Sequence, residues 1–275
     1  MPETGFLEFN GARLYYEAAG DGPALVLIHA GIADSRMWDA QFAEFARHCR
    51  VVRYDTRGFG RTQTEAVEFS NREDLAGLLD HLGIERATVV GVSRGGQIAG
   101  DFALEFPHRV SGLVTVCAGM SGFDYESVED AAALELDKAI FEAQEAKDWD
   151  RAAELDVRLW VDGPGQPVGR APAAARELVR QMTYDNMTRH HGDEKPLVLD
   201  PPAAGRLDEI RVPTLVIIGA LDTRDTVAVA DALAEGIPGA QKVVFENAAH
   251  VPSLEEPERF NQVLLEFLQA NGLAN

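Results

Sequence analysis

Residues 87–96 read Ala-Thr-Val-Val-Gly-Val-Ser-Arg-Gly-Gly and decide the fold of this 275-residue chain. Residues 87–90 are typical of a buried strand, and residues 97–106 show helical periodicity. A turn this sharp forces Ser93 into a strained backbone conformation and crowds the positions two before and two after it. Both positions are glycine, Gly91 and Gly95. The stretch therefore predicts a tight strand–turn–helix with Ser93 at its apex.

Ser93 in this context is typical of a nucleophile elbow, in which a serine hydroxyl is exposed at the start of a helix. The helix dipole at that point favours developing negative charge. On this motif alone, a glycine-rich turn with a solvated serine remains an alternative. A serine nucleophile also requires a base and an acid that orients the base, so the rest of the chain must supply both.

Two later strand ends supply such groups. Asp222 directly follows a predicted strand at 212–219, and His250 follows the next strand along the chain. Because the carboxyl ends of parallel strands meet at one edge of a sheet, we expect both side chains to lie near Ser93. Asp225 is the rival acid, but it falls where a helix begins and is better explained as an N-cap or first-turn residue. The sequence thus predicts a triad of Ser93, His250 and Asp222.

The chain as a whole alternates short apolar strands with helices, which is typical of a mostly parallel α/β sheet. Residues 121–205 interrupt the alternation, because they show helical periodicity and no convincing strand. We therefore predict a core of residues 1–120 and 206–275, with helices on both faces of an eight-stranded sheet, and a helical cap at 121–205. The predicted strands are 6–10, 13–17, 24–29, 51–55, 87–92, 110–117, 212–219 and 242–246.

An acyl-transfer site also needs backbone N–H groups that bind an oxyanion. The N–H of Arg94, the residue after the serine, is expected to supply one. The second is expected from Gly31, in the loop after the strand at 24–28, because a glycine lets the backbone approach a substrate closely. For Gly31 a simple structural turn remains an alternative.

Taken together, four separated motifs resemble the α/β-hydrolase superfamily over residues 6–268, with the helical insertion in the position of that family's cap. The motifs are His29-Ala30-Gly31 with Trp38, the segment 55–60, the Ser93 turn, and Asp222 with His250. The resemblance implies an α/β-hydrolase fold and Ser-His-Asp chemistry without specifying a substrate, and it implies a purely structural role for 55–60. The family's usual His-Gly pair is His-Ala here, so Gly31 is assigned by position only. Relatives with an aspartate nucleophile, such as haloalkane dehalogenases and soluble epoxide hydrolases, are disfavoured because position 93 is serine.

The side chain of Arg94 departs from the residues usual in similar sequences. A cation at a helix N-terminus opposes the helix dipole, so we expect it to have an acidic partner. A salt bridge to a protein carboxylate is the favoured interpretation. Recognition of a carboxylate on the substrate is the alternative, and the sequence leaves both open.

The resulting hypothesis is a serine hydrolase, free of cofactors and metals, that cleaves a small carboxylic ester or lactone through an acyl-enzyme on Ser93. A C–C bond hydrolase of a diketone-like, meta-cleavage-type substrate is an alternative with the same triad. A catalytically inactive ligand-binding protein of similar fold is an alternative of another class. For each large cap side chain, packing within the cap is as good an explanation as contact with substrate. The candidate pocket residues are Trp160, Phe141, Met182, Tyr184, Met187 and His190, of which Trp160 is favoured because it precedes a Gly/Pro segment that could act as a hinge.

Charge and composition limit the classes of binding partner that we expect for this chain. The 45 Asp and Glu residues against 25 Lys and Arg leave a net charge of −20, which disfavours nucleic acid and membrane surfaces. Residues 124–156 hold 12 acidic and three basic residues, a net −9 that we interpret as a solvated face of the cap. Cys49 and Cys117 lack the spacing of a zinc site or disulfide framework. We expect a cytoplasmic protein with a small-molecule substrate, because neither a signal peptide nor a membrane segment is evident. A homo-oligomer is left open.

Overall fold

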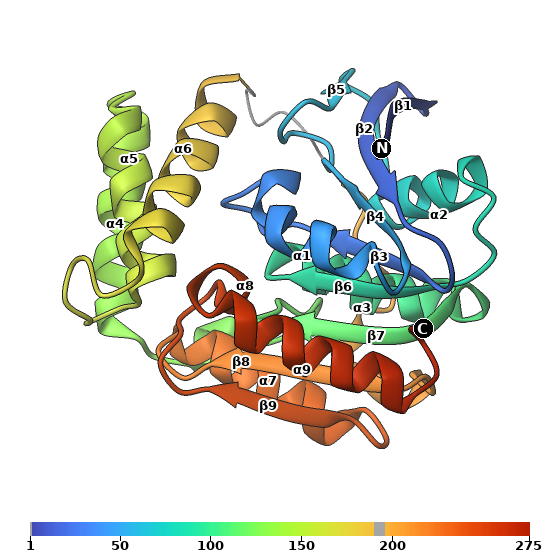
Figure 1. Cartoon of the computed structure of the whole chain (residues 1–275). Coiled ribbons are helices and arrows are strands. Elements are labelled where there is room, and N and C mark those ends of the chain that lie inside the picture. The colour runs from blue at the N-terminus through green and yellow to red at the C-terminus, as the bar shows by residue number, and fades with distance from the viewer. Residues whose placement is uncertain (1, 190–195) are drawn as a thin grey trace.

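A mostly parallel sheet forms the centre of the computed structural model, which describes residues 2–189 and 196–275 (Figure 1). In those residues the strands follow the order β1-β2-β4-β3-β6-β7-β8-β9, with β5 paired to β2 outside this path. The pairs β1–β2 and β2–β4 are antiparallel, and all pairs from β4 to β9 are parallel. The strands are β1 (Glu3–Phe9), β2 (Ala12–Ala19), β3 (Ala24–Ile28), β4 (Arg50–Tyr54), β5 (Gln63–Thr64), β6 (Ala87–Val92), β7 (Val110–Val116), β8 (Thr214–Gly219) and β9 (Gln241–Phe245).

The predicted fold class is confirmed, with one addition. The eight strands along the main path correspond to the eight expected from the sequence. The extra strand, β5, has two residues, which is too short for polarity to alternate in a recognisable way.

Helices cover both faces of the sheet. In Figure 1, α1 (Asp39–Phe45) and α9 (Pro257–Ala270) lie in front of it, and α3 (Arg94–Glu105) and α7 (Arg224–Gly236) lie behind. Two further helices, α2 (Asn71–His81) and the short α8 (Pro252–Glu255), pack against α3 and α9 respectively. In the described part of the chain, every helix falls short of the length or the apolar character that a membrane crossing requires.

The sequence explains where these helices begin and which side they bury. The hydroxyl of Ser70 accepts hydrogen bonds from the N–H groups of Arg72 and Glu73, which caps α2. Pro257 occupies the first turn of α9, where its missing N–H costs no helical hydrogen bond. The buried positions of α9 recur at intervals of three and four residues, so one stripe faces the sheet. They are Phe260, Leu264, Phe267 and Leu268.

Between β7 and β8 the chain leaves the sheet and forms a group of helices at one end of it (Figure 1). We refer to residues 131–189 as the helical insertion. It comprises α4 (Ala131–Glu145), α5 (Trp149–Asp156), a π-helical segment (Val157–Asp162) and α6 (Ala173–Arg189). It buries a small apolar cluster of its own and also contributes Val157, Val161, Val179 and Met182 to the main core. A division of the chain at residues 121 and 205 stays a prediction.

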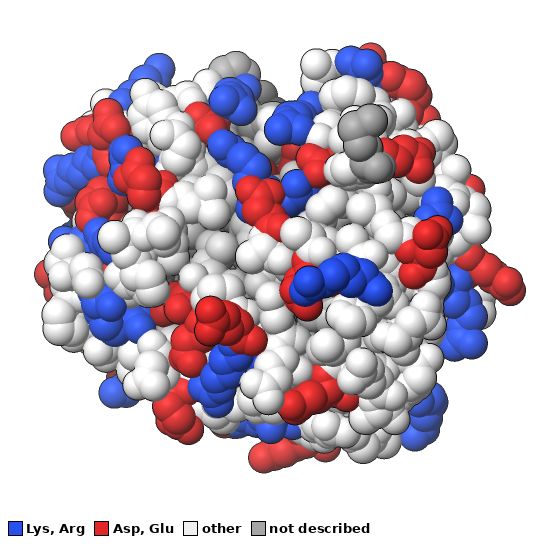
Figure 2. All heavy atoms as spheres, viewed as in Figure 1, with Lys and Arg blue, Asp and Glu red and all other residues white. Residues whose placement is uncertain are grey.

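The acidic stretch 124–156 lies mainly on the outside. Nine of its 12 acidic residues are exposed. Figure 2 shows acidic and basic side chains interspersed over the insertion on the face viewed. Asp156 is the exception, because its relative exposure is only 6%. Burial raises the pKa of Asp156 to about 7, aided by the negative charge of Asp137 and opposed by a hydrogen bond with the Trp160 side chain.

Replacing Asp156 with Asn should stabilise the protein more at pH 8 than at pH 5. A carboxyl with a raised pKa binds a proton more tightly in the folded chain than in the unfolded chain. The free energy of unfolding therefore falls as the pH rises from the unfolded value of 3.8 through about 7. The advantage of Asp156→Asn over wild type should grow by about 2–3 kcal/mol between pH 5 and pH 8. Urea unfolding at both pH values measures it.

Glu142→Gln is the control for this experiment, because Glu142 is an exposed carboxylate of the same insertion. Its effect on stability should differ little between the two pH values. An Asp156→Asn effect that is equally independent of pH would contradict the raised pKa.

Candidate active site

Ser93 lies in a strained turn between β6 and α3. Its backbone angles are φ 56° and ψ −120°, in the region that residues other than glycine rarely adopt. The neighbouring strand end holds it there, because its N–H donates to the carbonyl of Val116 at 2.9 Å and its carbonyl accepts from Gly119 at 3.1 Å. The serine is half-buried at the N-terminus of α3.

The two glycines around Ser93 are required by space. A Cβ atom on Gly91 would overlap the carbonyl oxygen of Gly95, and a Cβ on Gly95 would lie 2.5 Å from the carbonyl oxygen of Ile28. Both contacts involve backbone atoms, which cannot move aside cheaply. The tight strand–turn–helix predicted from this glycine spacing is therefore present.

His250 and Asp222 form a buried pair at the same edge of the sheet. The Nδ1 atom of His250 lies 2.7 Å from Oδ2 of Asp222, and Oδ1 of Asp222 accepts a hydrogen bond from the N–H of Thr223 at 2.8 Å. Such a pair holds an imidazole in the tautomer whose Nε2 is free to accept a proton. Asp225 instead lies in the first turn of α7 and accepts a hydrogen bond from the N–H of Thr226.

Cys117 links the three strand ends that carry these groups. It directly follows Val116, which holds the Ser93 backbone, and its sulfur lies 3.5 Å from both the N–H of Gly219 and the carbonyl of Ala249. Its sulfur, a carboxylate oxygen of Asp222 and a ring nitrogen of His250 all lie within 4.8 Å of one another. The sequence analysis assigned this cysteine to neither a zinc site nor a disulfide framework. Its position at a strand end was the available signal of a place beside Asp222 and His250.

The Cys117 group has the spacing of metal ligands. Burial and the nearby charge of Asp222 raise the pKa of the Cys117 thiol well above its usual value. The neutral thiol supports Asp222 by packing and hydrogen bonding, and a metal ion would have to displace its proton in order to bind.

The loop that carries Gly31 faces the start of α3. A Cβ atom on Gly31 would lie 3.8 Å from two side-chain carbons of Arg94, so the loop and the helix N-terminus are neighbours. His29 shapes the loop, with Nδ1 2.8 Å from the carbonyl of Ala30 and Nε2 3.0 Å from the N–H of Thr56. Burial lowers the pKa of His29, which favours the neutral ring that these contacts require.

The guanidinium of Arg94 has neutral groups beside it. It donates hydrogen bonds to Oγ1 of Thr56 at 2.8 Å and to Oδ1 of Asn71 at 3.1 Å. It also lies 4.9 Å from the centre of the Phe59 ring, within the range of a cation–π contact. Both of these acceptors are neutral, and the salt bridge expected from the dipole argument stays a prediction.

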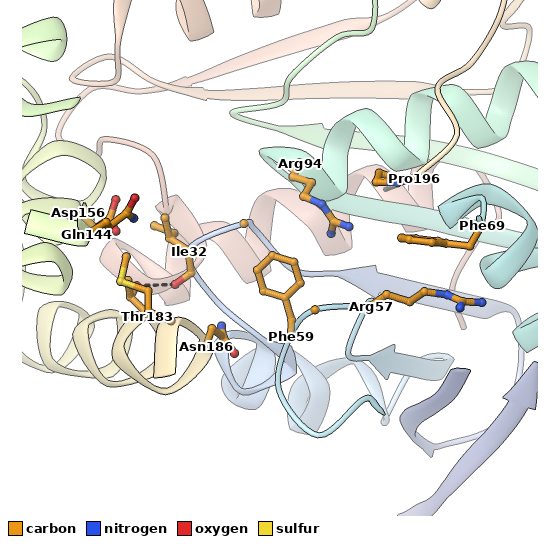
Figure 3. A pocket seen from close by; sticks show the side chains of 13 residues that line it. Ile32, Arg57, Phe59, Phe69, Arg94, Gln144, Asp156, Thr183, Asn186 and Pro196 are labelled. Carbon is orange, nitrogen blue, oxygen red and sulfur yellow. Dashed lines mark hydrogen bonds between the residues drawn. The ribbon is translucent and has the colours of Figure 1, made fainter. Parts of the chain in front are cut away.

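A cavity of about 450 Å³ extends from Gly31 and Arg94 to the helical insertion (Figure 3). Figure 3 shows Arg94 and Phe59 on the side of the core, and Asp156 and Gln144 on the side of the insertion. The two sides thus differ in polarity, with a cation on one and a carboxyl and an amide on the other. Further lining residues are Ile32, Arg57, Gly58, Phe69, Thr183, Asn186, Met187 and Pro196.

The candidate pocket residues are distributed differently from the sequence-based expectation. Met187 lines this cavity, whereas Met182 is buried in the main core and Phe141 is 62% exposed on α4. Tyr184 is partly buried and is not among the residues that line the cavity. His190 lies outside the described residues.

Trp160 contacts His250 and is not among the residues that line the cavity. Its ring centre lies 4.4 Å from that of His250, and its carbonyl accepts a hydrogen bond from the His250 N–H at 3.1 Å. The sequence indicated a hinge after Trp160 but gave no sign of this ring contact.

Sequence reasoning also missed Phe59 and Asp156 as cavity residues. Phe59 belongs to the segment 55–60, for which the family resemblance implies a purely structural role. That role is visible in Asp55, whose carboxylate accepts hydrogen bonds from the N–H groups of Ser35 and Arg61, each at 2.8 Å. Asp156 belongs to the acidic stretch, and only the phase of α5 distinguishes it from its exposed neighbours.

Known proteins resemble this chain over nearly its whole length. The 2-hydroxy-6-oxononadienedioate/2-hydroxy-6-oxononatrienedioate hydrolase of Paraburkholderia phymatum is 32% identical, over 93% of this chain and 91% of that protein. The pimeloyl-[acyl-carrier protein] methyl ester esterase of Pectobacterium atrosepticum is 28% identical, over 94% and 100%. The structure of a thermophilic esterase from Thermogutta terrifontis superposes with a TM-score of 0.76 at 26% identity, over 98% and 99% of the two chains.

A family model extends the resemblance from individual relatives to a whole family. The model of the alpha/beta hydrolase fold matches residues 23–257, which include the Ser93 turn and the His250–Asp222 pair. With the sheet order, the strained turn and this match in agreement, the chain belongs to the alpha/beta hydrolase fold family.

Proposed function

We propose that this protein is a serine hydrolase that cleaves a small-molecule carboxylic ester or lactone. The observation that carries the proposal is the buried hydrogen bond between His250 and Asp222 at the sheet edge where the strained Ser93 lies. A serine, an imidazole and a carboxylate in this chain order are the parts of a nucleophilic acyl-transfer site.

In the proposed reaction, Nε2 of His250 takes the proton of Ser93 while Oγ of Ser93 attacks the substrate carbonyl. Asp222 stabilises the imidazolium that forms. The backbone N–H groups of Gly31 and Arg94 donate hydrogen bonds to the oxyanion of the tetrahedral intermediate. The intermediate collapses to an acyl-enzyme, and His250 returns the proton to the departing alcohol oxygen.

Water completes the cycle. His250 removes a proton from a water molecule, whose oxygen attacks the acyl carbon, and the carboxylic acid leaves as Ser93 regains its proton. A lactone follows the same steps, with the alcohol still tethered to the product. The scheme uses neither a cofactor nor a metal, and the proposal includes a cytoplasmic location.

The helical insertion is proposed to act as a cap, within residues 121–205, that limits the size of the substrate. The cavity of about 450 Å³ between insertion and core is in the range of small-molecule sites. The similarity to an esterase at 28% identity supports the proposed cleavage of an ester.

Hydrolysis of a C–C bond is the second candidate function, because the relative at 32% identity is described as a hydrolase of 2-hydroxy-6-oxononadienedioate. The same triad can serve such a reaction. A side-by-side measurement of kcat/KM on a small ester and on a vinylogous diketone separates the two. An inactive binding protein is disfavoured by the complete set of triad residues.

Asp222→Asn should lower kcat for a p-nitrophenyl ester by about 10²–10⁴-fold with little change in KM. The amide would favour the wrong tautomer of His250 and would not stabilise the imidazolium. Asp225→Asn is the matched control, because Asp225 is bonded to its own helix and not to His250. It should retain kcat within about twofold. Equal losses in the two variants would contradict the assignment of Asp222 as the acid.

Arg94→Met should raise KM for a substrate with a free carboxylate by about tenfold or more. The guanidinium lines the cavity and is suited to a carboxylate on the substrate. A monomethyl dicarboxylate and its dimethyl ester form a matched pair, because the second carboxyl group is charged in the monoester and is made neutral by methylation in the diester. KM for the dimethyl ester should stay within about twofold. An equal rise for both esters would mean that Arg94 instead supports the loop through Thr56 and Asn71.

A further inference from the structure

One buried carboxylate holds the backbone on both sides of His250. The carboxylate of Glu255, in α8, accepts hydrogen bonds from the N–H of Ala249, 3.0 Å from each oxygen, and from the N–H of Val251 at 3.2 Å. These two residues flank His250 in the chain. The direction of the histidine backbone therefore depends on Glu255 remaining an acceptor at this position.

Arg170, from the helical insertion, is the cation that faces this carboxylate. Its guanidinium forms an ion pair with Glu255 and donates a hydrogen bond to the carbonyl of Asn247, at the start of the histidine loop. It also donates to the carbonyls of Val161 at 2.6 Å and Asp162 at 2.7 Å, at the end of the π-helical segment. The side chains of Arg170 and Glu255 are 17% and 1% exposed. One largely shielded guanidinium thus joins the insertion to the loop that carries His250.

The π-helical segment touches both loops of the His–Asp pair. The carbonyl of Trp160 accepts the His250 N–H, and the Trp160 ring packs on the imidazole. At the end of the segment, a Cβ on Gly163 would lie 2.5 Å from the carbonyl oxygen of Leu221, the residue before Asp222. Local π-helical turns are frequent at functional sites. The contacts of Arg170 therefore hold in place a segment that lies against His250 and against the loop that carries Asp222.

We propose that Arg170 is a positioning residue for catalysis, which holds His250 in place through Glu255 and couples the helical insertion to the histidine loop. The proposal rests on the function proposed above for Ser93, His250 and Asp222. It gives the insertion a second role, since the segment that covers the substrate also sets the position of the base.

The physical reason is the cost of an uncompensated buried carboxylate. Burial raises the pKa of Glu255, and Arg170 is a charged group that acts against this shift. Without the guanidinium, Glu255 favours its neutral form, whose oxygens accept the hydrogen bonds of Ala249 and Val251 more weakly than those of a carboxylate. A displacement of about 1 Å in a catalytic group can cost on the order of 10²-fold in rate. We expect this loss in kcat and not in KM, because Arg170 does not line the cavity described above.

Arg170→Met should lower kcat about 10–100-fold on a p-nitrophenyl ester and leave KM within about threefold. Arg170→Lys should recover part of the loss, because an ammonium can pair with Glu255 but cannot reach all four acceptors of the guanidinium. Arg180→Met is the matched control. Arg180 is 32% exposed and also lies in the insertion, but its ion pairs are with Asp150 and Glu177, which do not contact Arg170 or the π-helical segment. This variant should retain kcat within about twofold.

A second measurement does not depend on turnover. The Nδ1 proton of His250, shared with Asp222, should give a low-field proton NMR signal that shifts or broadens in Arg170→Met and is unchanged in Arg180→Met. Retention of both kcat and the signal in Arg170→Met would overturn the proposal, as would equal losses in the two variants. If Arg170→Met does not fold, Arg170→Lys against Arg180→Lys decides in the same way. A wild-type protein without hydrolase activity would refute the proposed function, while the NMR comparison would still test the coupling.

Discussion

The strained backbone of Ser93 is the constraint on which the rest of the site depends. A residue other than glycine at a φ of 56° costs on the order of 1–3 kcal/mol and persists only where its surroundings hold it. Here the central strand β6, the end of β7 and the first turn of α3 do so. Glycines at positions 91 and 95 let these backbones approach to contact distance. The parallel sheet then determines what else is close, because β7, β8 and β9 end at the same edge.

In the proposed active site, the core and the helical insertion have different roles. The core fixes Ser93 and, through the β8 and β9 loops, brings Asp222 against His250. The insertion approaches from the other side, with the Trp160 ring on the imidazole and Arg170 on the carboxylate beneath the histidine loop. If the insertion acts as a cap, as proposed, its movement also displaces His250, which would couple access to the cavity with catalysis.

The sequence predicted those features that follow from local spacing and strand order. The glycines around Ser93 predict the turn, and the ends of two successive strands favour Asp222 over Asp225 as the partner of His250. The Arg170–Glu255 pair, 85 positions apart, is beyond such reasoning because no local pattern links the two residues. The direction of each side chain in the insertion could not be predicted from such local patterns either. Without the phase of each helix, the exposure of Phe141 and the burial of Asp156 cannot be distinguished from the opposite arrangement.

The central claim is that Ser93 is the activated nucleophile, and a fluorophosphonate probe tests it most directly. Such a probe forms a covalent phosphonyl bond to a serine whose hydroxyl an adjacent base has activated. The native protein should take up about one phosphonyl group per chain, and peptide mass spectrometry should locate it on Ser93. Heat-denatured protein and Ser93→Ala should remain unlabelled. A native protein that stays unlabelled, or that carries the group on another residue, would contradict the account.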